Sequence, residues 1–148
     1  MDDPRAKLND ALKEAMKSKE NERRDVIRMA LSAVKQIEID TQKEVDSAGV
    51  IDVLQKEAKK RRESIDEMAK AGREESAAQE KRELDILEEF LPTQLTSDEI
   101  AAIVNEIIVQ VGATSAKDMN KVMVPLMQRV KGLADGKLVN QIAREILK

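Results

Sequence analysis

Apolar side chains recur at helical spacing along most of this chain, and that periodicity limits the fold more than any other feature. They stand three or four residues apart, as Ile100, Ile103, Val104 and Ile107 do, so that they share one face of an α-helix. The chain also contains a single aromatic residue, Phe90, whereas strands favour aromatic and β-branched side chains. We therefore predict an all-α fold without strands.

Glycines, prolines and short polar runs divide the pattern into seven predicted helices. Their approximate ranges are 4–17, 22–45, 50–71, 74–91, 98–111, 115–130 and 135–147. Pro4 after Asp3 suits the first position of a helix, and Thr96 with Glu99 fits a capping box. Pro125 is expected to kink or divide the sixth helix.

Pro92 marks the predicted boundary between two domains, because the residue before a proline avoids the helical conformation. The N-terminal domain, residues 1–92, is expected to hold four helices, with 22–45 and 50–71 as a long antiparallel pair. The C-terminal domain, residues 96–148, is expected to be a small three-helix bundle. Residues 46–49 are predicted to form a loop.

The chain has no cysteine and no histidine, which excludes disulfides, thiolate or imidazole metal sites, and the Ser-His-Asp and Cys-His nucleophile systems. Adjacent acids such as Glu74 and Glu75 lie in highly charged helices and indicate a solvated surface rather than acid–base catalysis. We expect no catalytic residue, cofactor or metal. No apolar run approaches the ~20 residues of a membrane span, and the N-terminus lacks an apolar signal segment, which favours a cytoplasmic location.

The net charge of −3 is unevenly distributed. Residues 1–92 carry 19 basic and 23 acidic side chains, whereas residues 113–148 carry 7 basic and 3 acidic ones. The basic cluster at residues 59–62 lies within one helical turn of several acids and favours an ion-paired, solvated helix face, with phosphate contact as the alternative. Met119, Met123 and Met127 recur every four residues, which favours core packing over an adaptable groove for a partner.

Residues 131–140 combine glycines, lysines and an aspartate between two apolar helical segments. The glycines would let an anion approach the backbone, and the free N–H groups at the start of the last helix attract negative charge. A tight inter-helix turn that needs glycine only for its geometry is the alternative, and the residues alone favour it. The candidate anion-binding or RNA-binding residues are Lys131, Gly132, Asp135, Gly136, Lys137 and Asn140.

These residues, which read KGLADGKLVN, resemble the closing motif of YqeY-like proteins, also called GatB/YqeY domain proteins. The other matching segments are RMALSA at 28–33, Ala71-Gly72-Arg73, LEEFLP at 87–92 with Gln94-Leu95, and DMNKVM at 118–123. The C-terminal half of this family is similar to the tail domain of the B subunit of glutamyl/aspartyl-tRNA amidotransferase, which helps to grip tRNA. The resemblance implies a non-catalytic accessory or binding protein for tRNA or a tRNA-linked complex.

Two positions depart from the family pattern and two other functions stay open. Leu133 stands where relatives often have a basic residue, and Asn120 stands where glycine is usual. The family is commonly labelled as a carbon–nitrogen ligase with glutamine as amido donor, which implies a component of tRNA amidotransferase. The five isolated glycines form no amidase or ATP loop. A protein-interaction module without nucleic acid is the other alternative.

Overall fold

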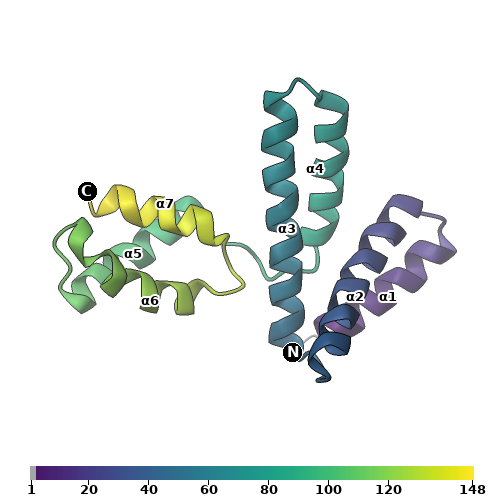
Figure 1. Cartoon of the computed structure of the whole chain (residues 1–148), viewed down its shortest axis with the longest axis horizontal. Helices are drawn as coiled ribbons and strands as arrows, with labels where there is room; N and C mark the ends of the chain where they lie inside the picture. The colour runs from purple at the N-terminus through teal and green to yellow at the C-terminus, as the bar shows by residue number, and fades with distance from the viewer. Residues whose placement is uncertain (1–2) are drawn as a thin grey trace. The chain divides into compact units, whose positions relative to one another are not determined.

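A computed structural model describes residues 3–148 and divides the chain into two compact units (Figure 1). Unit 1 ends at Pro92, and unit 2 runs from Thr93 to Lys148. The elements are α1 (Pro4–Lys17), α2 (Asn21–Thr41), α3 (Ser47–Lys70), α4 (Glu74–Glu88), α5 (Ser97–Val111), the 3-10 helix η1 (Ala116–Asp118), α6 (Met119–Val130) and α7 (Gly136–Ile146). Residues 3–148 contain no strand, which confirms the predicted all-α fold.

The long antiparallel pair of unit 1 is α3 with α4, rather than the predicted pair 22–45 and 50–71. Figure 1 shows α3 beside α4 and α1 beside α2, and these two pairings are the most extensive in the unit. Gly72 adopts φ 76 directly after α3 and reverses the chain within three residues. That conformation costs glycine little, so α3 and α4 meet through a tight connection.

Helix α2 is shorter than predicted, because it ends at Thr41 instead of 45. Gln42 adopts a left-handed conformation, φ 56, at the end of the helix, and the backbone N–H of Val45 then donates to the Glu38 carboxylate over 2.9 Å. The predicted loop at 46–49 is also wrong. Asp46 is the N-cap of α3 and accepts a hydrogen bond from the backbone N–H of Gly49 over 2.8 Å, so the helix begins at Ser47.

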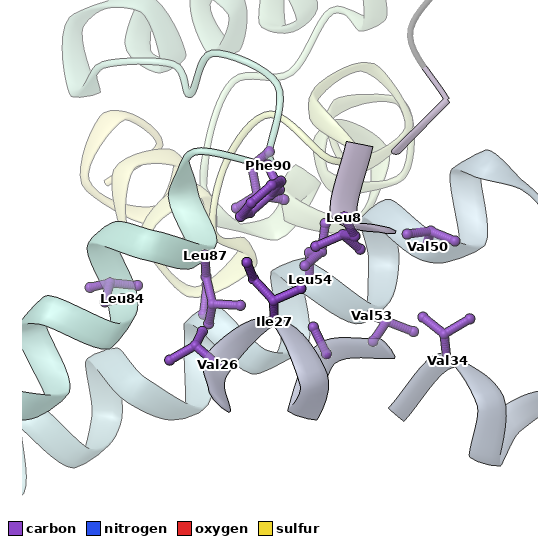
Figure 2. Packing of buried hydrophobic residues seen from close by; sticks show 13 residues of the cluster. Leu8, Val26, Ile27, Val34, Val50, Val53, Leu54, Leu84, Leu87 and Phe90 are labelled. Carbon is purple, nitrogen blue, oxygen red and sulfur yellow. The ribbon is translucent and has the colours of Figure 1, made fainter. Parts of the chain in front are cut away.

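The core of unit 1 lies where its four helices converge (Figure 2). Its largest fully buried side chains are those of Leu8, Ile27, Leu54, Leu87, Val34 and Val50. Each contributes about 1.5–3 kcal/mol by leaving water. Helix α4 ends at Glu88, and Phe90 and Leu91, predicted as its last turn, form a buried turn that closes this core. Met16, although it stands four residues after the apolar Leu12 in α1, is 51% exposed.

Unit 2 is a bundle of α5, α6 and α7 around a separate core. The predicted capping box is present: the Thr96 hydroxyl accepts from the Glu99 backbone N–H, and the Glu99 carboxylate accepts from that of Thr96. Pro125 does not divide the sixth helix. It removes one N–H donor from α6, but Val122 and Leu126 are fully buried on either side of it and hold the helix in one piece.

No single helix within residues 3–148 combines the length and apolar character of a membrane span. The helices Ser97–Val111 and Ala116–Val130, which are bent by 88° at the break between them, reach the length and apolar composition of a span only when they are counted as one segment.

Candidate functional site

The turn between α6 and α7 needs glycine at one position for its backbone geometry. Gly132 adopts φ 78, a conformation that side chains with a Cβ rarely take. The backbone N–H of Leu133 donates to the carbonyl of Val130 over 2.8 Å and tightens the turn. Gly132 is therefore explained by local geometry.

Residues near the start of unit 2 hold this turn. The side-chain amide of Gln94 donates to the carbonyl of Gly132 over 3.1 Å, and the backbone N–H of Leu95 donates to the carbonyl of Leu133 over 2.8 Å. Two segments that are matched separately in the sequence pattern, Gln94-Leu95 and 131–140, thus form one structural element. Sequence spacing gives no sign of this contact.

The N-terminus of α7 is capped by an acid of the chain itself. Asp135 stands at the N-cap, and its carboxylate accepts from the backbone N–H of Lys137 over 3.4 Å. The negative carboxylate at the N-cap interacts with the partial positive charge at the N-terminus of the helix, and it repels a second anion that would bind there. At Gly136, a Cβ would lie 3.3 Å from the terminal methyl of Met127. The free space predicted at that glycine is occupied by a side chain of α6.

The exposed face of α7 carries basic and amide side chains together with one exposed acid, Glu145. Lys137, Gln141 and Arg144 are exposed at spacing i, i+4 and i+7, while Val139 and Ala143 are fully buried on the opposite face. Lys131, in the turn before α7, and Lys148, after it, are also exposed. We call Lys131, Lys137, Arg144 and Lys148 the basic face of unit 2. The sequence signal for Arg144 was its helical spacing from Lys137; Lys148 follows the end of the helix.

In the part of the chain that the structure describes, the cations of the basic face lack acidic partners, as does the exposed Lys117 of η1, whereas the two other cations of the same unit are ion-paired. Lys121 pairs with Asp118 over 3.7 Å and Arg129 pairs with Glu106 over 2.9 Å. Across residues 3–148, no acid lies within ion-pair distance of any member of the basic face. Asn140, the remaining predicted site residue, is half-buried on α7.

The basic cluster at residues 59–62 serves the fold of unit 1. The Arg61 guanidinium lies 3.3 Å from the Glu57 carboxylate and 3.6 Å from that of Glu83, and Arg62 lies 3.6 Å from Glu88. The predicted ion pairing is confirmed, but Arg61 is only 8% exposed, so a fully solvated face is wrong. Burial raises the pKa of the Glu83 carboxyl above its ordinary value, although Arg61 opposes this.

The methionines of α6 divide between the core and the surface. Met119 and Met123 pack against the core of unit 2, as predicted, whereas Met127 is 39% exposed. Within residues 3–148, no group of three or more acidic side chains is arranged to hold a metal ion.

Comparison with known proteins identifies a family model over nearly the whole chain and curated relatives over 57–68% of it. The family model described as "Yqey-like protein" matches residues 5–147. Three curated relatives are each named "Altered inheritance of mitochondria protein 41, mitochondrial". The relative from Kluyveromyces lactis is 40% identical over 86 residues (57% of this chain, 46% of the relative), that from Eremothecium gossypii 32% over 103 residues (68% and 56%), and that from Lachancea thermotolerans 36% over 87 residues (58% and 46%).

The chain spans about half the length of these curated relatives. All three are named as mitochondrial proteins, and this finding contradicts the predicted cytoplasmic location. That prediction relied on the lack of an apolar signal segment, a feature that does not distinguish among compartments within a cell.

Proposed function

This chain belongs to the YqeY-like protein family, and we propose that it is a non-catalytic binding protein that contacts tRNA, or a tRNA-linked complex, through the basic face of unit 2. One observation carries the proposal: Lys131, Lys137, Arg144 and Lys148 are exposed and have no acidic partner within residues 3–148. Phosphate groups supply negative charge that can pair with these four cations. The resemblance of the C-terminal half to a tRNA-gripping tail domain supports RNA as their source.

The arrangement on α7 suits a phosphate backbone better than a single small anion. The Cα atoms of Lys137 and Arg144 are seven residues apart in the helix, which corresponds to about 10 Å at 1.5 Å per residue. Gln141 lies between them and adds a neutral donor for phosphate oxygens. Asp135 already caps the helix N-terminus, so the proposed contact lies along the helix side rather than at its end.

The charge count sets the expected strength of binding. If all four cations of the basic face neutralise phosphates, the slope of log affinity against log salt is about −3.6, and affinity falls on the order of 100-fold between 50 and 200 mM salt. Such binding is electrostatic and tolerant of sequence. Recognition of a particular RNA would then require further contacts, supplied by unit 1 or by a partner protein.

A catalytic role is not proposed, because the perturbed acids have structural partners. Glu83, whose pKa is raised, faces Arg61, while the pKa of Glu38 and that of Asp118 are lowered by hydrogen bonds that fix a loop and a helix start. General acid–base catalysis instead needs a perturbed group within reach of a substrate. Glutamine-dependent amide transfer would have to be carried out by other subunits of a complex.

The test is tRNA binding by the full chain, measured by fluorescence anisotropy across 50–500 mM salt. The Lys137→Glu/Arg144→Glu variant should lower the affinity on the order of 100-fold at 50 mM salt, because each contact contributes about 15-fold between 1 M and 50 mM. Its slope should be smaller in magnitude by about 2. Lys13→Glu/Lys59→Glu, which makes the same charge change on exposed residues of unit 1, is the control. Equal losses in both variants, or no binding by the wild type at 50 mM, would refute the proposal.

A protein-interaction module is the second candidate. Val109 is 81% exposed and Val124 is 65% exposed on unit 2, so both apolar side chains are available for contact with another protein. Nuclease treatment of a pull-down separates the candidates. A protein partner retained after nuclease, without bound RNA, would favour this second function.

A further inference from the structure

Arg61 is a buried guanidinium whose hydrogen-bonding groups are poorly satisfied. Its side chain reaches from α3 toward α2 and α4 and is about 10% exposed. Nη1 donates to the backbone carbonyl and to the carboxylate of Glu57, both over 3.3 Å, which is long for a charged pair. Nε is buried without a hydrogen-bond acceptor within residues 3–148, because the Glu83 carboxylate is 3.6 Å away. A buried donor without a good acceptor destabilises the fold.

The remaining contact of Arg61 is with a methionine. Nη2 lies 3.2 Å from the sulfur of Met29 on α2. A thioether sulfur is a weak acceptor, so this contact satisfies the guanidinium N–H only in part. Met29 is also 37% exposed, whereas Val26 and Ala30, near it on α2, are buried. A solvent-accessible methionine is therefore the acceptor for Nη2 of a buried guanidinium whose carboxylate contacts are made through its other nitrogens.

We propose that Met29 is a reversible oxidation site whose sulfoxide is bound by Arg61. A peroxide transfers one oxygen atom to the sulfur: the O–O bond breaks, the S–O bond forms, water leaves, the thioether loses two electrons and the peroxide gains them. The sulfoxide oxygen is a strong acceptor and takes the place of the sulfur opposite Nη2. The three rotatable bonds of the methionine let the sulfur move back to make room. Sulfoxide reductases reverse the step.

Met16 provides an internal comparison. It is 51% exposed on α1, and its sulfur lies 3.8 Å from Nη2 of Arg28, which is itself exposed. The Arg28 donors can bind water, so a sulfoxide at Met16 adds little. Exposure alone predicts that Met16 is oxidised at least as readily as Met29. The two sites should differ in the consequence of oxidation for stability.

The experiment uses the full chain with Met16, Met68, Met119, Met123 and Met127 replaced by leucine, a change that conserves volume. Dilute hydrogen peroxide is added, peptide mass spectrometry follows the sulfoxide at Met29, and melting is measured before and after oxidation. Oxidation should raise the melting midpoint of unit 1 by about 4–8 °C, the range for one additional hydrogen bond in a unit of this size. The same treatment of the Arg61→Lys variant should give no rise.

A second measurement avoids oxidation. Met29→Gln places an amide oxygen near Arg61, and Met29→Leu places none, so the glutamine variant should melt higher than the leucine variant, with no such difference in the Arg61→Lys background. A lower melting midpoint after oxidation of Met29, an equal response in Arg61→Lys, or no sulfoxide at Met29 would overturn the proposal.

Discussion

Alanine at Gly132 and at Gly136 should change stability in opposite directions, although both glycines belong to one turn. Gly132 has φ 78, and an L-residue in the left-handed region costs about 1–2 kcal/mol. Gly136 has no such constraint and is the first residue of α7. Alanine there lowers the conformational entropy of the unfolded chain and favours the folded state by about 0.4–1 kcal/mol.

The new Cβ at position 136 meets one obstacle, the terminal methyl of Met127 at 3.3 Å. This contact is tight, but the methyl is the free end of a flexible side chain that is 39% exposed, so a movement of a few tenths of an ångström relieves it. The net expectation is a loss of about 1–2 kcal/mol for Gly132→Ala and a gain of up to about 0.5 kcal/mol for Gly136→Ala.

Urea denaturation followed by circular dichroism gives the two free energies of unfolding, and hydrogen exchange of peptides from α7 assigns the change to unit 2. The tRNA titration should be unchanged for Gly136→Ala, because the proposed contact lies along the side of α7. A loss of stability at position 136 as large as that at 132 would show that Met127 cannot move. A neutral Gly132→Ala variant would refute the explanation of that glycine by backbone geometry.

Two predictions concern unit 1. The hydrogen bonds that Glu38 accepts from Arg5 and from the Val45 N–H lower the pKa of its carboxyl below 4.5. The contribution of Glu38 to the stability of the fold is therefore fully present above pH 4.5 and is lost as the pH falls through the lowered pKa. When the melting midpoint is measured against pH, its fall below pH 4.5 should be less steep for Glu38→Gln. Leu54→Ala should cost about 2.7–5 kcal/mol in urea denaturation, because Leu54 is fully buried, whereas Ile39→Ala at a 60% exposed position should stay within about 0.5 kcal/mol.

The sequence predicts best those features that depend on neighbours within one helical turn. Asp3 and Thr96 begin helices as N-caps, as predicted, and the predicted ends of the third and fifth helices are followed by Gly72 and Gly112, which are left-handed in the structure. In each case the side chain or the missing Cβ acts on backbone no more than four residues away. These signals define most of the helix ends.

The end of α2 was not predictable in this way, because distant residues determine it. Arg5 binds the Glu38 carboxylate with two hydrogen bonds, of 3.2 and 2.9 Å, and also donates to the carbonyl of Val45 over 2.9 Å. These contacts hold the chain that leaves α2 against α1. Gln42 takes the left-handed conformation without being a glycine, so no residue type marks the turn.

The sequence motif at 131–140 indicated where the candidate site lies, but it did not indicate which exposed side chains form the basic face of unit 2. The geometry of the turn accounts for three residues of the motif. Gly132 adopts a left-handed φ, Asp135 caps α7, and Gly136 lies close to the methyl of Met127. The unpaired charges continue beyond the motif to Arg144, which helical spacing places on the same face as Lys137, but their lack of ion pairs is seen only in three dimensions. Sequence neighbours cannot supply that information.

The one aromatic ring of the chain gives unit 1 a spectroscopic signal of its own. Phe90 is buried in the core of unit 1, and the Arg23 guanidinium lies over its ring, 5.5 Å from the centroid. A fluorinated phenylalanine incorporated during expression would therefore label a single position, and its resonance would report the packing of unit 1 alone. Unit 2 contains no aromatic residue, so its RNA titrations and unfolding could be followed without interference from that label.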